Sequence, residues 1–212
     1  MTHVSLTRKG WVRRGLGLTY ATAAYNSLES LIAIGFGLAV GSVALVGFGF
    51  DSLIELTATG AAIWRLYNDA DPAMRAVAER RTLKVVGWCF LLLAAYVGVE
   101  ASRALLTASH PEETFVGIVL AALSLIIMPL LARAKRKVAR EVDSEALAAE
   151  AMQTMLCTYL SAILLVGLML NAFLGWWWAD PVAALAMTPI IAQEGFRALK
   201  GKDPCGDDCH LP

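Results

Sequence analysis

The chain has 212 residues, of which 58% are hydrophobic and 17% are charged, and its formal net charge at pH 7 is zero. A mean hydropathy of +0.59 is too high for a soluble domain of this size. These values exclude an ordinary soluble protein and favour one that crosses a membrane several times.

Six apolar segments are long enough to cross a bilayer as helices, since about 20 residues suffice for one crossing. The segments are residues 17–39, 42–66, 84–107, 114–133, 148–174 and 180–199. We therefore predict an all-α, polytopic membrane protein, a six-transmembrane-helix bundle formed by residues 17–199. Residues 1–16 and 200–212 are predicted to be a cytoplasmic N-terminal segment and a cytoplasmic tail.

The placement of lysine and arginine predicts the orientation. Nearly all of them lie in the N-terminal segment, in the connections after the second and fourth spans, and in the tail. Basic loops stay on the cytoplasmic side, so we expect both termini to be cytoplasmic in a multi-pass protein of the inner (plasma) membrane. The basic run at residues 133–137 is expected to lie in a loop that meets anionic lipid headgroups.

Two of the spans carry polar pairs at helical spacing. Asn26 and Glu29 lie three residues apart in the first span, and Asp51 and Glu55 lie four apart in the second. Each pair therefore falls on one helix face. A carboxylate near the bilayer centre costs at least ~2.5 kcal/mol, so these acids need protons, a basic partner or a bound cation.

The fifth span adds a polar stripe of Glu150, Gln153, Thr154 and Cys157. With a rise of about 1.5 Å per residue, Glu29, Glu55 and Cys157 all lie roughly 13–17 Å from the cytoplasmic ends. Three spans thus place a potential ligand at one level, and this coincidence favours a bound cation.

Carboxylates together with a thiolate suit a divalent transition metal such as zinc, whereas magnesium and calcium prefer more oxygens and no sulfur. Ligands must lose their protons to bind a metal, so metal binding and proton binding oppose each other. The candidate metal ligands and their neighbours are Asp51, Glu55, Cys157, Glu29, Gln153, Asn26 and Glu150.

Each candidate also has a simpler interpretation. Asn26 and Gln153 can join helices by hydrogen bonds alone. Glu150 lies near the cytoplasmic end of its span and can be solvated, and Cys157 can be an ordinary packed thiol. The acidic pair of the second span can share a proton.

Polar residues away from the candidate ligands predict an ion pair and a second metal site. Glu100 and Arg103, three residues apart, are expected to neutralise each other. In the tail, Cys205, Cys209 and His210 form a candidate secondary metal site. A terminal segment with incidental cysteines is the alternative.

These motifs resemble the cation diffusion facilitator (cation efflux) family. The matching stretches are FGFDSLIE at residues 48–55, the fifth-span segment 144–161, and GWWWADPVAAL at residues 175–185 followed by QEGF. The resemblance covers residues 16–199 and implies a cation transport domain. In the family, two ligands four residues apart on each of the second and fifth spans bind zinc, and protons flow in the opposite direction.

Carried over, Asp51 and Glu55 match the second-span pair, with glutamate in place of aspartate. Gln153 and Cys157 fall on the fifth-span pair, and neither is the usual histidine or aspartate. Family members continue with a cytoplasmic domain that supports dimerisation, whereas this sequence ends at Pro212. We therefore expect a short branch without that domain, and a homodimer is one of two alternatives.

The first hypothesis is a secondary transporter that exports a divalent transition metal, with zinc as the first candidate, in exchange for protons. The alternative is a non-transporting metal sensor or partner subunit that binds metal through the same site. We expect no enzyme, because the histidines lie outside the spans. We also expect no organic cofactor and no nucleic acid; the expected partners are the metal ion, protons and the lipid bilayer.

Overall fold

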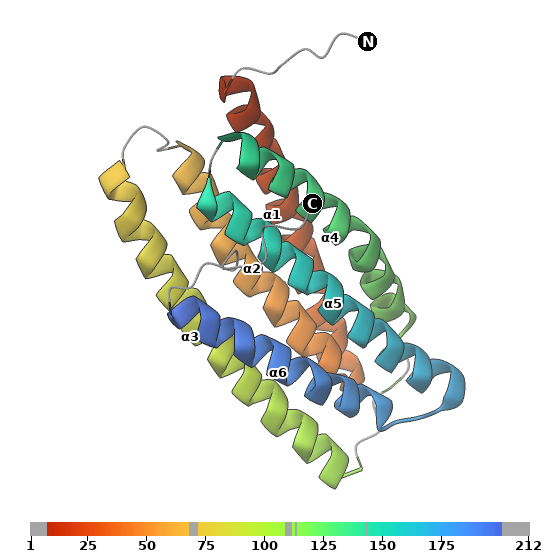
Figure 1. Ribbon diagram of the computed structural model, residues 1–212. Coiled ribbons are helices and arrows are strands. Elements are labelled where there is room, and N and C mark those ends of the chain that lie inside the picture. Colours follow the sequence, from red (N-terminus) through yellow and green to blue (C-terminus); the bar gives the residue numbers. More distant parts are fainter. Residues whose placement is uncertain (1–7, 68–71, 109–111, 113, 143, 201–212) are drawn as a thin grey trace, which may run out of the picture.

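The computed structural model describes residues 8–67, 72–108, 112, 114–142 and 144–200. Within these ranges all regular structure is helical, which confirms the predicted all-α class (Figure 1). The helices are α1 (Arg8–Val40), α2 (Val43–Tyr67), α3 (Pro72–Leu106), α4 (Phe115–Val142), α5 (Glu145–Leu174) and α6 (Ala179–Leu199).

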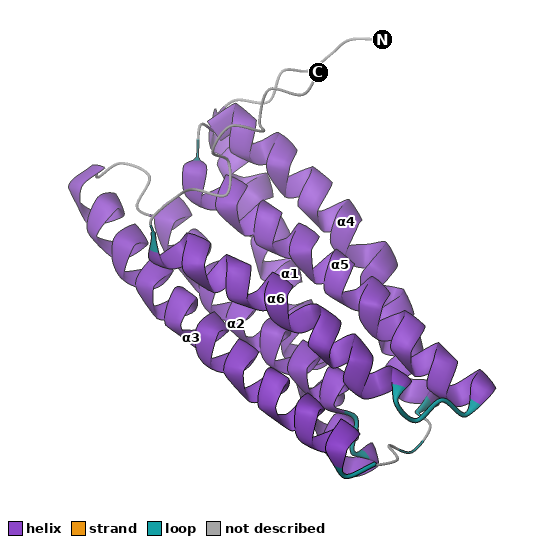
Figure 2. Ribbon diagram, turned by 60° about the horizontal axis from the view of Figure 1, so that its bottom comes forward, coloured by secondary structure: helices purple, strands orange, loops and turns teal. Residues whose placement is uncertain are grey.

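The helices form an elongated bundle suited to a bilayer. The helices α1 to α5 each contain a segment that is long and apolar enough to cross a membrane. The sixth, α6, does not meet that combined criterion, but its 21 residues correspond to about 31 Å. It runs beside α3 in both views (Figure 2). The chain is thus a multi-pass membrane protein.

Three helices extend more than five residues beyond the predicted spans. The first begins at Arg8 rather than at residue 17, α3 begins at Pro72, and α4 continues to Val142. The prediction of a loop at residues 133–137 is therefore wrong. Packing explains the extensions of α1 and α4, because side chains from the start of α1, the end of α4 and the start of α5 form a small apolar cluster. We call this cluster the small core: Val138, Ala139, Val142 and Leu147, with Trp11, Val12, Leu18 and Ala148 against them.

The centre of the bundle is formed by α2 and α5, which contact each other. The second helix also touches α1, α3 and α6, and α5 also touches α4 and α6. Small residues let some of these helices approach closely: a Cβ atom added to Gly87 of α3 would lie 3.0 Å from the carbonyl oxygen of Gly195 in α6. Such close backbone packing stabilises helix pairs in membranes.

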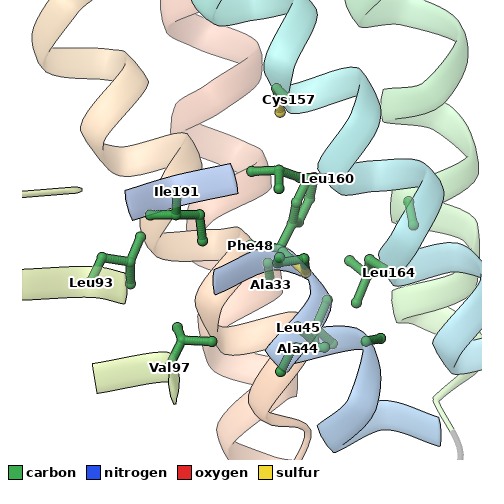
Figure 3. Packing of buried hydrophobic residues seen from close by; sticks show 14 of the residues in the cluster. Ala33, Ala44, Leu45, Phe48, Leu93, Val97, Cys157, Leu160, Leu164 and Ile191 are labelled. Carbon is green, nitrogen blue, oxygen red and sulfur yellow. The ribbon is translucent and has the colours of Figure 1, made fainter. Parts of the chain in front are cut away.

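A larger apolar cluster fills the half of the bundle next to the α1–α2 turn. We call it the large core, and Figure 3 shows part of it, including Leu45 and Phe48 of α2, Val97 of α3 and Leu164 of α5. All four are fully buried. Cys157 lies at the edge of the labelled residues (Figure 3).

The turns α1–α2, α3–α4 and α5–α6 meet at this end. The Glu112 amide donates to the carbonyl of Val40 at 2.9 Å. Asp180, 1% exposed in the first turn of α6, accepts hydrogen bonds from the hydroxyl of Ser42 and from the Val43 amide at 3.0 Å. A helix begins with amides that lack intrahelical partners. The carboxylate of α6 therefore caps the N-terminus of α2.

Replacing Asp180 by alanine should lower the free energy of unfolding by about 1–2 kcal/mol, because the first amides of α2 lose their acceptor. Asp180→Asn, which keeps an acceptor oxygen, should lose less. Thermal unfolding of the purified protein in detergent measures the difference. Glu100→Ala is the control, because its ion pair with Arg103 is exposed and worth about 0–1 kcal/mol. Equal stability of Asp180→Ala and wild type would contradict the cap.

Candidate metal site

The candidate ligands lie in a polar layer at the border of the large core that faces the small core. On α5, the small core ends at Ala148 and the large core begins at Cys157. Glu150, Gln153 and Thr154 lie between them. On α1, Leu18 packs against the small core, and the large core extends from Tyr25 to Ala33, so Asn26 and Glu29 lie where the large core begins. Local sequence thus places these polar residues at one depth.

Three carboxyl side chains are buried in this layer. Glu29 and Glu55 are each 1% exposed, and Asp51 is 6% exposed. One oxygen of Glu29 accepts a hydrogen bond from the hydroxyl of Ser52 in α2 at 2.8 Å. One oxygen of Glu55 accepts from the hydroxyl of Thr154 in α5 at 2.6 Å. Each glutamate is therefore held through one oxygen by a neighbouring helix.

The thiol of Cys157 faces the same region. It is fully buried, and its sulfur lies 3.9 Å from the hydroxyl oxygen of Ser124 in α4. Glu29, Glu55 and Asp51 all lie close enough to interact with it electrostatically. Their assignment as metal ligands stays a prediction.

The ligands are near one another but not yet in a coordination sphere. In the described part of the chain, no three side chains among histidine, cysteine, aspartate and glutamate stand close enough to hold a metal ion together. Zinc ligands lie about 2.0–2.3 Å from the ion. Binding would therefore require the carboxylates and the thiol to move closer.

Several buried polar atoms in the layer have no hydrogen-bond partner among the described residues. They include the second carboxyl oxygens of Glu29, Glu55 and Glu150, and both amide atoms of Asn26. An unsatisfied buried polar group costs about 1–3 kcal/mol. Proteins rarely keep such groups without a use. Carboxyl oxygens without a partner, in the same layer as a thiol, are ligand types that suit a divalent transition metal.

Glu150 has a partner that sequence reasoning missed. Its carboxylate accepts from the ammonium of Lys135 in α4 at 2.7 Å, and both side chains are buried. The same ammonium donates to the hydroxyl of Thr154 at 3.0 Å. The interpretation of Glu150 as a solvated residue is therefore wrong.

The burial of Lys135 follows from the continuation of α4. Its buried side chains recur at three- and four-residue spacing, including Ser124, Met128, Ala132, Lys135 and Ala139. Lysine thus occupies a position on the inward face. This spacing was the available signal, but the basic run around it indicated a loop.

The remaining predicted residues are Gln153, the pair of Glu100 and Arg103, and the three metal-ligand candidates of the tail. Gln153 is half-buried, and its amide nitrogen has no partner within the described ranges. The predicted pair of Glu100 and Arg103 is confirmed, with 2.8 Å between nitrogen and oxygen. The tail residues Cys205, Cys209 and His210 lie outside the described residues.

Comparisons with known proteins point to one family. The family model for the cation efflux transmembrane domain matches residues 82–201. The cation-efflux pump FieF of Shewanella oneidensis is 28% identical over 112 residues, which cover 53% of this chain and 36% of the pump. The uncharacterized transporter sll1263 of Synechocystis is 25% identical over 166 residues, 76% of this chain and 54% of that protein. The chain thus spans about a third to a half of the length of these relatives.

Lys135→Ala should destabilise the protein by about 3–5 kcal/mol, because it leaves the Glu150 carboxylate buried without its cation. The double variant Lys135→Met with Glu150→Gln removes both charges and should recover most of that loss. Unfolding in detergent, followed for both variants and wild type, checks the comparison. A double variant that is no more stable than Lys135→Ala would show that the pair does not act as described.

Proposed function

The chain belongs to the cation efflux family, and from this premise we propose that it exports a divalent transition metal, zinc first, in exchange for protons. The family is one of transporters rather than enzymes. The metal is the substrate, and the proposed ligands are Asp51, Glu55 and Cys157, with Glu29 and Gln153 completing or orienting the site. Asn26 is proposed to support them by hydrogen bonding.

The observation that carries this proposal is a set of buried donor atoms from three helices, two of which are carboxyl oxygens without a hydrogen-bond partner among the described residues. Glu29 of α1 and Glu55 of α2 each keep one carboxyl oxygen without a hydrogen-bond partner in the described part of the chain. The buried thiol of Cys157 in α5 lies within their electrostatic reach. A cation that binds between them would satisfy atoms from separate helices at once.

Exchange with protons follows from the same chemistry. In an apolar interior a carboxylate without a cation is costly, so a proton replaces the metal when the metal leaves. Metal binding then releases protons, and proton binding releases metal. A location within the bundle, at its central helices, agrees with where secondary transporters bind their substrates.

The sulfur atom favours zinc or a softer ion over magnesium or calcium. A thiolate is a ligand for zinc and for soft metals, whereas hard cations select oxygen. Gln153, on the position where the family resemblance implies a histidine or aspartate, supplies only an amide oxygen. Cys157 is therefore the residue expected to set the choice of metal.

A metal sensor or partner subunit without transport is the second candidate. It is favoured by the open arrangement of the ligands, since no three metal-binding side chains of the described residues are close enough to hold an ion. Purified protein in proteoliposomes with a pH gradient separates the two functions. A transporter moves zinc across the membrane in the direction opposite to the proton gradient, whereas a sensor binds zinc and moves none.

The surroundings of the protein are also part of the proposal. We place both termini in the cytoplasm and the bundle in the inner membrane, because the three turns that meet at one end contain no lysine or arginine at residues 41–42, 107–114 and 175–178. The tail residues Cys205, Cys209 and His210 are proposed to capture metal on the cytoplasmic side. Association as a homodimer is a further proposal.

Glu55→Gln should abolish most zinc transport, because the amide keeps the shape of the side chain but loses the negative charge that attracts the ion. Cells that express it should accumulate more zinc than cells that express wild type. Glu100→Gln is the matched control, since Glu100 lies partly exposed and pairs with Arg103. Equal zinc accumulation with Glu55→Gln and wild type, at equal protein levels, would count against the transport site.

Cys157→Ser should shift the metal preference from soft towards hard ions, because a hydroxyl replaces the thiolate. Metal uptake by vesicles, measured separately for zinc, cadmium and manganese, checks the shift. Cys89→Ser is the control, since Cys89 is a half-buried free thiol that packs against the large core. Unchanged preference in Cys157→Ser would remove the thiol from the proposed site.

A further inference from the structure

A chain of hydrogen bonds leads from a buried lysine to one of the proposed ligands. The Lys135 ammonium of α4 donates to the hydroxyl oxygen of Thr154 at 3.0 Å. That oxygen lies 2.6 Å from a carboxyl oxygen of Glu55. The three side chains are buried and come from α4, α5 and α2. Lys135 therefore reaches the proposed metal site without touching a proposed ligand of α2.

The hydroxyl of Thr154 has a choice of acceptors. It carries one proton, and both the Glu55 carboxylate at 2.6 Å and the backbone carbonyl of Glu150 at 2.9 Å lie within reach. Because the lysine donates to the hydroxyl oxygen, the hydroxyl proton must point away from the ammonium. When Glu55 is ionised, as a metal ligand must be, this charged acceptor forms the stronger bond. The proton therefore goes to Glu55.

The bond to Thr154 also determines which part of Glu55 is free. One oxygen accepts the hydroxyl proton, and the other has no hydrogen-bond partner among the described residues. A side chain fixed through one oxygen presents the other in a constant direction. Metal ligands generally depend on such supporting hydrogen bonds, whose loss costs about 10–100-fold in metal affinity.

We propose that Thr154 and Lys135 are positioning residues for metal binding: Lys135 orients the hydroxyl of Thr154, and this hydroxyl holds Glu55 with one oxygen free for the ion. The inference rests on the proposed function, since it takes Glu55 as a ligand. The pair of Lys135 with Glu150 then has a second role besides stability, because it holds the ammonium in place beside Thr154.

Titration of zinc into the purified full-length protein in detergent, followed by calorimetry, tests the inference. Thr154→Val keeps the shape of the side chain and removes the hydroxyl, so zinc binding should weaken about tenfold. Thr154→Ser restores the hydroxyl and should bind nearly as wild type does. The double variant Lys135→Met with Glu150→Gln should weaken binding by a similar factor without leaving a charge unpaired.

Thr22→Val is the matched control. Thr22 is equally buried, and its hydroxyl donates to the carbonyl of Leu18 one turn back on α1. The same substitution there removes a buried hydroxyl without changing the support of Glu55, so zinc affinity should not change. A merely structural role of Thr154 would lower the unfolding temperature of Thr154→Val while zinc affinity stayed that of Thr22→Val, and this result would overturn the inference.

Combining the variants tests whether Lys135 acts through Thr154. The triple variant of Thr154→Val, Lys135→Met and Glu150→Gln should bind zinc no more weakly than Thr154→Val alone, because the lysine has no hydroxyl left to orient. If the triple variant instead lost affinity by the product of the factor for Thr154→Val and the factor for the double variant, the role of Lys135 would be overturned. If Thr154→Val does not fold, the comparison of Lys135→Met/Glu150→Gln with wild type still decides, since unchanged affinity there overturns the same role.

The outcome for wild type separates this inference from the proposed function. Wild-type protein that binds no zinc would contradict the proposed function. Wild-type protein that binds zinc, together with a Thr154→Val variant of equal affinity, would contradict only the positioning role.

Discussion

Charge buried in an apolar bundle is the constraint on which the rest of the structure depends. Glu29, Asp51, Glu55 and Glu150 lie inside the helices, where an unpaired carboxylate is expensive. Of these four acids, Glu150 is the one that forms an ion pair within the described part of the chain, and its partner is Lys135. Glu29 and Glu55 each accept a hydroxyl proton through one oxygen, and the other oxygen has no hydrogen-bond partner within the described residues. This excess of buried acids over buried ammonium groups favours the binding of a cation.

The two apolar cores determine the depth of the polar layer in the bundle. The large core occupies the end where the turns α1–α2, α3–α4 and α5–α6 meet, and the small core occupies the extensions of α1, α4 and α5. The polar layer lies at the border of the large core that faces the small core, and on α4 Lys135 stands between Leu131 of the large core and Val138 of the small core. Helices that carry ligands on one face and apolar residues above and below it can change their mutual distance while the depth of the site stays the same.

Much of this could be predicted from the sequence, because it depends on local spacing. Hydropathy predicted the helical class and the spans, and the three- and four-residue spacing predicted which polar residues share a face. The partners of these residues could not be predicted. Ser42 and Asp180 are 138 positions apart, and neither carries a signal that names the other. Lys135 lies in a basic run typical of loops, and its burial depends on the packing of Val138 and Val142 beyond the expected end of the span.

The cap of Asp180 on the start of α2 has a mechanical consequence. A side chain from α6 holds the hydroxyl of Ser42 and the amide of Val43, so these two helices are tied together at a single end. Sliding of α6 along α2 would break both bonds, whereas a tilt about that end would keep them. Relative motion of the two helices is therefore restricted to an angular opening, widest at the cytoplasmic ends in the proposed orientation and smallest beside Asp180. The end of the bundle beside Asp180, opposite the cytoplasmic end, is therefore the stiffer of the two ends.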